Sequence, residues 1–251
     1  MRGPVAYIGG KRAIAQKIID CFPEHTTYVE PFAGGAQVFF RKTPSKVEVL
    51  NDIDGEIVNL FRVCQSHHEE LIRTMRFTLV SRNWFDLLRK TDPATLTDIQ
   101  RAARTLYLQK NAYAGRVDRQ NYRASIVQPS GFNPERLPDL IDETHHRLAR
   151  VQIECLPYEK VLAKYDSPST LFYLDPPYYG IRLYKANLDP DDFRAMAERL
   201  AKIKGRFLLS LNDVPEVRAI FKAFHVMGIE MPYTSQKVAG RRFREVLISN
   251  F

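Results

Sequence analysis

Residues 175–178, Asp-Pro-Pro-Tyr, have the types and spacing needed to hold an exposed amino group. They follow the apolar run 170–174, which predicts a buried strand, and ligands usually bind where parallel strands end. Each proline ring fixes φ and removes an N–H, so the carbonyl before it points in a defined direction. Asp175 adds a charged acceptor and Tyr178 a flat aromatic face, which together suit a planar heteroaromatic amine such as adenine N6. A Pro-Pro turn that simply leaves a strand is the alternative interpretation.

A glycine-containing segment, residues 28–36, leads from a predicted strand through Gly34 and Gly35 into a predicted helix. Glycines let a ligand approach the backbone closely, and a helix start offers unpaired N–H donors. The segment does not match G-x-G-x-x-G, so the usual dinucleotide fingerprint is absent. It therefore indicates a ligand loop without naming the ligand.

An acidic segment, residues 51–54 (Asn-Asp-Ile-Asp), follows the second predicted strand. In nucleotide-binding α/β folds, an acid about 20 residues beyond the glycine loop binds ribose hydroxyls, and Asp52 stands at that distance. The alternative is an N-cap for a helix that starts near Gly55. Both roles can coexist, with Asp52 on the ligand and Asp54 on the cap.

Two weaker segments complete the set of candidate ligand contacts. Residues 7–11 (Tyr-Ile-Gly-Gly-Lys) offer an aromatic ring, a close-approach turn and, in Lys11, a cation that can meet a carboxylate. Residues 210–213 (Ser-Leu-Asn-Asp) follow the fifth predicted strand and either line the cleft or cap the helix predicted at 214–223. For residues 7–11, an ordinary turn before a helix is the alternative.

These segments need a sheet to bring them together, and the hydrophobic pattern predicts one. Short runs of Val, Ile, Leu, Phe and Tyr predict strands at roughly 28–32, 46–51, 151–155, 170–175, 206–211, 224–230 and 245–250. Amphipathic stretches between them predict helices at 11–21, 158–165, 190–203 and 215–223. The alternation indicates an α/β, Rossmann-like, mostly parallel seven-strand sheet. The last two strands lack a helix between them, so we expect the last strand to run antiparallel.

The pattern changes between residues 54 and 150, where we expect an inserted, mainly helical subdomain. Helical periodicity dominates 54–76 and 97–110, and a stretch rich in turn residues from 111 to 138 indicates a hairpin or loop. The sheet domain would then comprise residues 1–53 and 151–251.

The composition favours a polyanionic partner and excludes several other classes. The 251 residues are 45% hydrophobic and carry a formal net charge of +8. No apolar run of about 18 residues predicts a membrane span, and the N-terminus lacks the apolar core of a signal peptide. The cysteines Cys21, Cys64 and Cys155 are scattered and odd in number. They indicate packed thiols in a reducing cytoplasm rather than disulfides or a metal site.

Basic residues concentrate in two places. Between 101 and 125 one acid, Asp118, faces six cations, and three tyrosines are interleaved: Arg101, Arg104, Lys110, Arg116, Arg119, Arg123, Tyr107, Tyr113 and Tyr122. A second cluster comprises Lys237, Arg241, Arg242 and Arg244. Such patches are typical of nucleic-acid surfaces, although a solvated helix face has the same composition.

Taken in chain order, these residues resemble the Dam-like (D12 class) family of adenine-N6 DNA methyltransferases. The resemblance spans nearly the whole chain and rests on the pieces at 7–11 (YIGGK), 30–35 (EPFAGG), 51–54 (NDID), 111–115 (NAYAG), 175–178 (DPPY) and 244–250 (REVLISN). It implies S-adenosylmethionine as cofactor, double-stranded DNA as partner and a flipped-out adenine as substrate. It also implies a monomer or weak dimer, without metal or membrane, in the cytoplasm of a prokaryote or encoded by a phage. Host defence beside a restriction enzyme, phage anti-restriction and chromosomal marking all stay open.

The resemblance also assigns roles by position. The catalytic residues it implies are Asp175, Pro176 and Tyr178. The cofactor-binding residues it implies are Tyr7, Gly10, Lys11, Glu30, Phe32, Gly34, Asp52 and Asp175, with Lys11 near the methionine end and Asp52 on the ribose. With the basic clusters, it places DNA contacts at Lys110, Asn111, Tyr113, Arg116, Arg119, Arg123, Lys237, Arg241 and Arg242, so that 54–150 becomes a target-recognition domain.

The sequence departs from the family pattern at three points. Ala36 stands where the glycine loop often has a last glycine, Pro157-Tyr158 stands where Asp-Phe is usual, and Ala114 replaces an Asn before glycine. The second departure leaves the cofactor contact there open, and the third means that no recognition sequence can be carried over. An RNA adenine-N6 methyltransferase and a catalytically silent DNA-binding protein with the same fold remain as alternatives.

Overall fold

The computed structural model describes the chain except residues 2, 6, 8, 119, 128, 183, 185 and 230–243. The described residues form one seven-stranded sheet in the order β3-β2-β1-β4-β5-β7-β6. The strands are β1 (Thr27–Glu30), β2 (Val47–Asn51), β3 (Gln152–Glu154), β4 (Thr170–Leu174), β5 (Arg206–Asn212), β6 (His225–Ile229) and β7 (Glu245–Ser249). Strands β1 to β5 pair in parallel, whereas β7 pairs antiparallel with both β5 and β6. The predicted α/β class and the antiparallel last strand are confirmed.

Both faces of the sheet are buried at its central strands β1, β2, β4, β5 and β7, which explains why these strands read as apolar runs. In β4, Leu171 and Tyr173 belong to one core, and Phe172 and Leu174 belong to the other. One face is covered by α7 (Tyr158–Tyr165), α8 (Pro190–Leu200) and α9 (Pro215–Ile220). The other packs on η1 (Lys11–Ala13) and α1 (Ala15–Ile19), and its core continues into the helices of residues 54–150.

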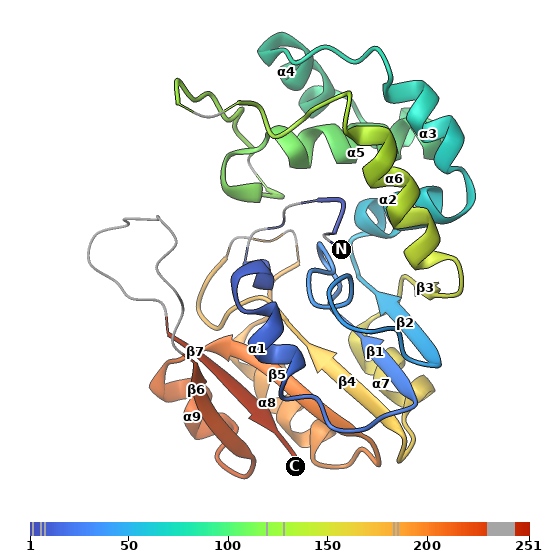
Figure 1. Cartoon of the computed structure of the whole chain (residues 1–251). Coiled ribbons are helices and arrows are strands. Elements are labelled where there is room, and N and C mark those ends of the chain that lie inside the picture. Colours follow the sequence, from blue (N-terminus) through green and yellow to red (C-terminus); the bar gives the residue numbers. More distant parts are fainter. Residues whose placement is uncertain are drawn as a thin grey trace.

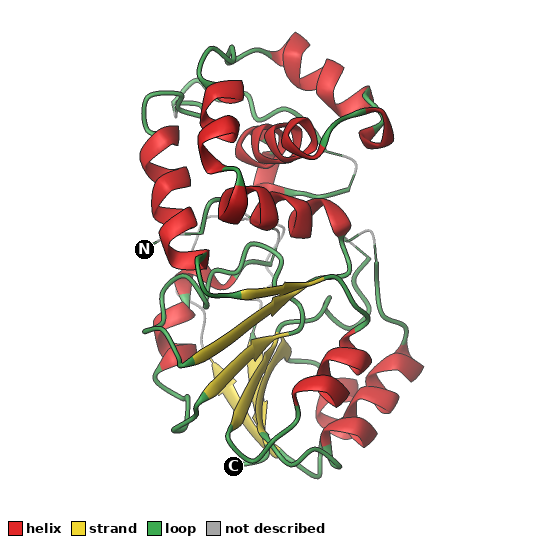
Figure 2. Cartoon of the chain, turned by 90° about the vertical axis from the view of Figure 1, so that its right-hand side faces the viewer, coloured by secondary structure: helices red, strands yellow, loops and turns green. Residues whose placement is uncertain are grey.

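Helices α2 to α6 gather at one end of the molecule, beyond the sheet (Figures 1 and 2). They are α2 (Gly55–Ser66), α3 (His68–Met75), α4 (Arg82–Lys90), α5 (Asp98–Asn111) and α6 (Leu137–Leu148), with short turns η2 (Pro93–Thr95) and η3 (Tyr113–Gly115). Asp54 caps α2 by accepting from the Glu56 N–H at 3.1 Å, as predicted. Helices α4 and α6 are absent from the prediction. For α6 a signal existed, since Pro138 lies in its first turn and Ile141 and Leu148 share its buried face.

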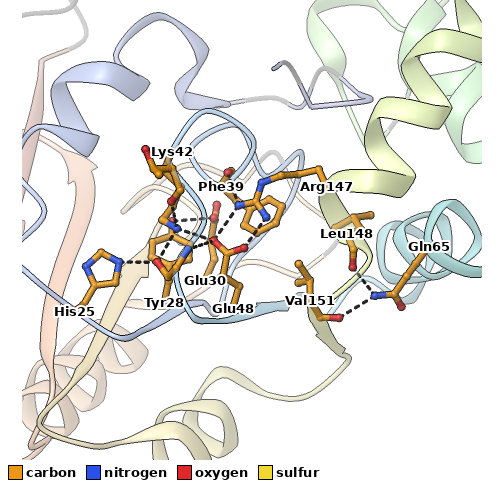
Figure 3. Close-up of polar contacts among 12 residues, drawn as sticks. His25, Tyr28, Glu30, Phe39, Lys42, Glu48, Gln65, Arg147, Leu148 and Val151 are labelled. Carbon is orange, nitrogen blue, oxygen red and sulfur yellow. Dashed lines mark hydrogen bonds and ion pairs between the residues drawn. The ribbon is translucent and has the colours of Figure 1, made fainter.

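A buried network fastens α6 to the sheet (Figure 3). Arg147 donates two hydrogen bonds to the Glu48 carboxylate of β2, at 2.5 and 2.9 Å. Lys42 donates to the same carboxylate at 2.6 Å. Beside them, the Gln65 amide of α2 donates to the carbonyls of Leu148 and Val151 at 2.7 and 2.8 Å.

The glycine loop departs from the prediction of a helix after Gly35. Residues 36–42 form consecutive turns instead. Gly34 and Ala36 adopt left-handed φ values of 46° and 47°, which a helix does not allow. Every residue from 33 to 40 is buried, so the segment has no polar face with which to form an amphipathic surface helix.

The cysteine prediction holds in part. Cys64 is buried and Cys21 is half-buried, but Cys155 is exposed, so the expectation that all three thiols are packed is wrong for Cys155. Among the described residues, no helix is both long and apolar enough to cross a membrane. Within the same residues, no three His, Cys, Asp or Glu side chains group as a metal site.

Candidate active site

A cavity of about 430 Å³ opens at the carboxyl ends of β1, β2, β3 and β4. Its walls come from five loops that the sheet brings to one edge. All the residues predicted to bind the cofactor line it: Tyr7, Gly10, Lys11, Glu30, Phe32, Gly34, Asp52 and Asp175. The topology therefore brings together segments that lie up to a whole domain apart in the sequence.

Asp52 ties the glycine loop to the start of α2. Its Oδ2 accepts from the Gly34 N–H at 2.7 Å, and its Oδ1 accepts from the Asp54 N–H at 2.8 Å. Burial raises the pKa of Asp52 to about 6, although these backbone N–H groups oppose the shift. The result is a half-buried acceptor that two backbone N–H groups hold in place on the cavity wall.

Glu30 ends β1 and is a second buried acid in the cavity wall. It accepts a hydrogen bond from the Tyr28 hydroxyl at 3.0 Å. Burial raises its pKa to about 8, and the nearby charge of Asp175 adds to the effect, whereas Tyr28 and Lys42 oppose it. At neutral pH this carboxyl is therefore mostly protonated.

Asp175 follows β4 and is fixed through one of its two oxygens. The Lys11 ammonium lies 2.7 Å from Oδ1, and the Ser210 hydroxyl donates to the same Oδ1 at 3.0 Å. Among the described residues, Oδ2 accepts no hydrogen bond, and the side chain is 19% exposed in the cavity wall. One carboxylate oxygen is thus held by the protein and the other is left for a ligand.

Lys11 is surrounded by the protein's own acceptors. Besides Asp175, its ammonium contacts the Tyr178 hydroxyl and the Gly9 carbonyl, both at 3.1 Å, and lies 3.6 Å from Glu245 Oε1. Burial alone would lower the pKa of Lys11, but Asp175, Tyr178 and Glu245 outweigh burial and hold the pKa well above its ordinary value. The carboxylates that Lys11 meets are therefore those of Asp175 and Glu245 in its own chain.

Comparison with known proteins agrees with this geometry. The family model for the D12 class of N6 adenine-specific DNA methyltransferases matches residues 7–234. The chain belongs to this family. It is 26% identical to the type II methyltransferase M1.LlaDCHI of Lactococcus lactis subsp. cremoris, over 98% of this chain and 94% of that protein.

Two other relatives extend the comparison. The type II methyltransferase M.CviBI of Paramecium bursaria Chlorella virus NC1A is 27% identical over 96% of this chain and 94% of its own length. The DNA adenine methylase of Escherichia coli K12 is 26% identical over 70% of this chain and 65% of its own. The family inferred from the ordered motifs is confirmed, and with it adenine-N6 DNA methylation as the activity.

Residues 210–213 neither line the cavity of this methyltransferase site nor cap a helix, and two of them hold the Asp-Pro-Pro-Tyr loop from behind. Ser210 bonds to Asp175, and the Asn212 amide clamps the Tyr179 backbone, accepting from its N–H at 2.9 Å and donating to its carbonyl at 3.1 Å. Helix α9 starts at Pro215 with Val214 as N-cap and no side-chain cap. The capping alternative is therefore wrong, and the strand end positions the Asp-Pro-Pro-Tyr loop.

Two site residues had no assigned role in the sequence prediction. Glu245 starts β7 and reaches Lys11 and Tyr178. Tyr184 lines the cavity and stacks near Tyr7, with ring centroids 6.3 Å apart. Sequence spacing gives no sign of Tyr184, because it lies in an irregular loop after β4.

Pro157 and Tyr158, where the sequence departs from the family pattern, still contribute to the cavity. Both residues line it, and the Tyr158 ring lies 5.2 Å from the Phe32 ring, centroid to centroid. The wall is apolar here, where the family often has an acid.

The structure places the predicted DNA contacts in different environments. Tyr113 is 60% exposed. Lys110, Arg116 and Arg123 are half-buried, and burial lowers the pKa of Lys110 to about 8 with Arg12 contributing. The prediction for the Asn111 side chain is wrong, because it is buried and its amide is held inside the protein. Four predicted contacts lie outside the described residues: Arg119, Lys237, Arg241 and Arg242.

Two of the interleaved tyrosines are packing residues. Tyr107 is buried, and its hydroxyl donates to the Leu79 carbonyl at 2.9 Å. Tyr122 packs edge-on against Phe85 at 5.5 Å. Arg101 is held by Glu56 at 2.5 Å. The sequence pattern of basic residues and aromatics therefore mixes surface groups with groups packed among the helices of residues 54–150.

Proposed function

We propose that this methyltransferase transfers the methyl group of S-adenosylmethionine to N6 of an adenine flipped out of duplex DNA at a specific sequence. The observation that carries the proposal is Asp175, which lines the cavity and whose Oδ1 is fixed by Lys11 and Ser210, while its Oδ2 accepts no hydrogen bond from the described residues. Such an acceptor suits an exocyclic amine.

The cavity chemistry fits the cofactor. Asp52 offers a carboxylate for ribose hydroxyls, and the Asp175 carboxylate in the same wall favours a cationic ligand. The apolar wall of Phe32 and Tyr158 suits a flat purine. When bound, the cofactor supplies a methyl group already activated by the positive sulfur.

Asp175 and the carbonyl of Pro176 then act on the nucleophile. The N6 lone pair of adenine is delocalised into the ring, so the amine reacts poorly until its hydrogens are held by acceptors. Oδ2 of Asp175 and the Pro176 carbonyl would accept these two hydrogens and draw the nitrogen toward tetrahedral geometry. Positive charge grows on N6 as the new bond forms, and the Asp175 carboxylate stabilises that charge more in the transition state than in the ground state.

The target base must first leave the duplex, which costs a few kcal/mol. Stacking on the Tyr178 ring returns roughly 1–3 kcal/mol, so it can about offset flipping. Duplex affinity must then come from phosphate contacts, which we assign to residues 54–150 and the basic C-terminal segment. The sheet domain, residues 1–53 and 151–251, would carry the chemistry, and the insert would choose the sequence.

The decisive experiment is methylation of mixed-sequence duplex DNA, with the modified positions mapped and the nucleosides identified by mass spectrometry. N6-methyldeoxyadenosine at one recurring sequence is expected. RNA of the same sequences serves as a parallel substrate, and preferential labelling of RNA would replace duplex DNA as the substrate. Cofactor and DNA binding without any methyl transfer would instead indicate a silent binding protein.

A further inference from the structure

Glu245 occupies a position that only the sheet topology explains. It is the first residue of β7, and β7 runs antiparallel to β5 with Glu245 opposite Asn212, the last residue of β5. The first residue of an antiparallel strand lies at the edge where its parallel neighbours end. Glu245 therefore lies beside the Asp-Pro-Pro-Tyr loop, although it falls beyond residue 234, where the family match ends.

The carboxylate of Glu245 is buried, and only one of its two oxygens has a hydrogen-bond partner among the described residues. The residue is 2% exposed. Its Oε1 accepts a short hydrogen bond from the Tyr178 hydroxyl and lies 3.6 Å from the Lys11 ammonium. Its Oε2 is buried with no hydrogen-bond partner among the described residues. Such a group costs stability, so its presence calls for a function.

We infer that Glu245 is a positioning residue for methyl transfer, holding Lys11 and the Tyr178 hydroxyl beside Asp175 and sharing the Lys11 charge with it. The inference rests on the proposed function of Asp175. Glu245 is absent from the cavity lining, whereas Lys11 and Asp175 are part of it, so Glu245 acts through them.

The first consequence is geometric. Asn212 of β5 clamps the Tyr179 backbone, and Glu245 of β7 holds the hydroxyl of the preceding Tyr178. The paired strands thus fix the loop at two successive residues. The Tyr178 ring is held in one orientation before any base arrives, which lowers the entropy cost of forming the reactive arrangement.

The second consequence is electrostatic. One ammonium lies between two carboxylates, so Lys11 does not neutralise Asp175 alone. Without the charge of Glu245, Lys11 would pair only with Asp175. That pairing would lower the pKa of Asp175 and make its carboxylate a weaker hydrogen-bond acceptor. The other titratable groups that act on Asp175, Lys11 or Glu245 are Glu30, Tyr173, Tyr178 and Tyr184. Glu245 therefore keeps Asp175 basic enough to accept hydrogens from N6.

The test is Glu245→Gln, which keeps the shape and an acceptor oxygen but removes the charge. We expect kcat to fall at least about tenfold, with KM for DNA and cofactor within about twofold, and the acidic limb of the kcat profile to move to lower pH. The matched control is Glu154→Gln, because Glu154 accepts from Lys164 and the Tyr165 hydroxyl, both at 2.6 Å, at the far edge of the sheet. That control should keep the wild-type kcat and pH profile.

A second variant protects the test against misfolding. Tyr178→Phe keeps the ring but removes the hydroxyl, and Tyr165→Phe is its control. We expect Tyr178→Phe to lower kcat and the double variant with Glu245→Gln to lose less than the product of the two single losses. A folded Glu245→Gln enzyme with wild-type kcat and an unmoved acidic limb overturns the inference, as does a fully active Tyr178→Phe. If the wild-type enzyme itself forms no N6-methyldeoxyadenosine, the proposed function fails instead.

Discussion

Among the lysines that the structure describes, two are almost fully buried, and they are neutralised in different ways. Lys11 lies between the carboxylates of Asp175 and Glu245, so its cluster has one cation and two anions. Lys42 shares the single carboxylate of Glu48 with Arg147, so its cluster has two cations and one anion (Figure 3). Neighbouring charges hold the pKa of Lys11 well above its ordinary value, whereas burial lowers the pKa of Lys42 despite Glu48.

The clusters also differ in how far their carboxylates are satisfied. Both oxygens of Glu48 are occupied, by two bonds from Arg147, one from Lys42 and one from the Ser45 N–H. On the Lys11 side, Oδ2 of Asp175 and Oε2 of Glu245 accept no hydrogen bond from the described residues. Glu48 belongs to an anchor that joins α6 to β2, while Asp175 lines the cavity and Glu245 lies buried beside it.

We expect the largest effect from replacing Asp175, whose Oδ2 accepts no hydrogen bond from the described residues. Asp175→Ala should lower kcat by at least about a thousandfold, because it removes the charge that stabilises developing cationic N6. DNA binding should stay within a few-fold of wild type, because the basic insert is untouched. Single-turnover methylation and fluorescence anisotropy on the same duplex measure the two quantities. Near-wild-type turnover would refute the assigned role of Asp175.

In the Lys42 cluster, we expect removal of a charge to lower the free energy of unfolding rather than kcat. Glu48→Gln leaves Lys42 and Arg147 without a buried counter-charge, and we expect a loss of about 3 kcal/mol in unfolding free energy. Below its melting temperature the variant should keep a kcat within about threefold of wild type. Urea unfolding and initial rates at low temperature separate the two effects, with the half-buried Glu154→Gln as the control. A drop in kcat as large as that of Asp175→Ala would erase the contrast between the clusters.

The sequence predicted the sheet well because buried strands are short apolar runs bounded by turns. All seven predicted strands agree with the structure within two residues at each end. The same logic placed Asp175, Asp52 and Gly34 at one edge, since parallel strands end there. Helix α4 was missed because its buried face is little more than Phe85, while Leu87 is 54% exposed.

The local sequence pattern could not show which charged side chains form the two clusters. The role of Glu245 depends on β7 running antiparallel between β5 and β6, a long-range fact that places a strand start beside strand ends. Asn111 and Tyr107 were assigned to the surface because composition cannot show which face of α5 is buried. Pairing partners such as Arg147 and Glu48, which are 99 residues apart, are likewise invisible until the fold is known.

Glu30 connects the two clusters and offers a pH test. The charges of both Asp175 and Lys42 act on the Glu30 carboxyl, and burial raises its pKa from 4.5 to about 8. Between those values the unfolded chain releases the proton while the folded chain keeps it, so stability falls as pH rises. Relative to Glu30→Gln, the wild type should lose about 2 kcal/mol between about pH 6 and 7.5.

Denaturant unfolding of both proteins across that range measures the difference, with Tyr28→Phe as the control that keeps the acid and removes its hydroxyl donor. Parallel stability profiles for wild type and Glu30→Gln would show that Glu30 is ionised in the folded protein. The two clusters would then be separated by a charge rather than joined through a neutral acid.

The smallest effect is expected in the loop that runs from Glu30 to Lys42 and joins the clusters. Ala36 adopts a left-handed φ of 47°, which costs a residue with a Cβ roughly 1–2 kcal/mol. Ala36→Gly removes that strain but adds chain entropy of about 0.5–1 kcal/mol in the unfolded state, so the net gain should lie between about 0 and 1.5 kcal/mol. Gly34→Ala is the contrast, because its new Cβ would lie 2.9 Å from the Tyr7 ring at a φ of +46°. It should displace Tyr7 and weaken cofactor binding, measured by calorimetry beside thermal melts. Equal small changes in both variants would mean that the loop adapts freely and does not couple the clusters.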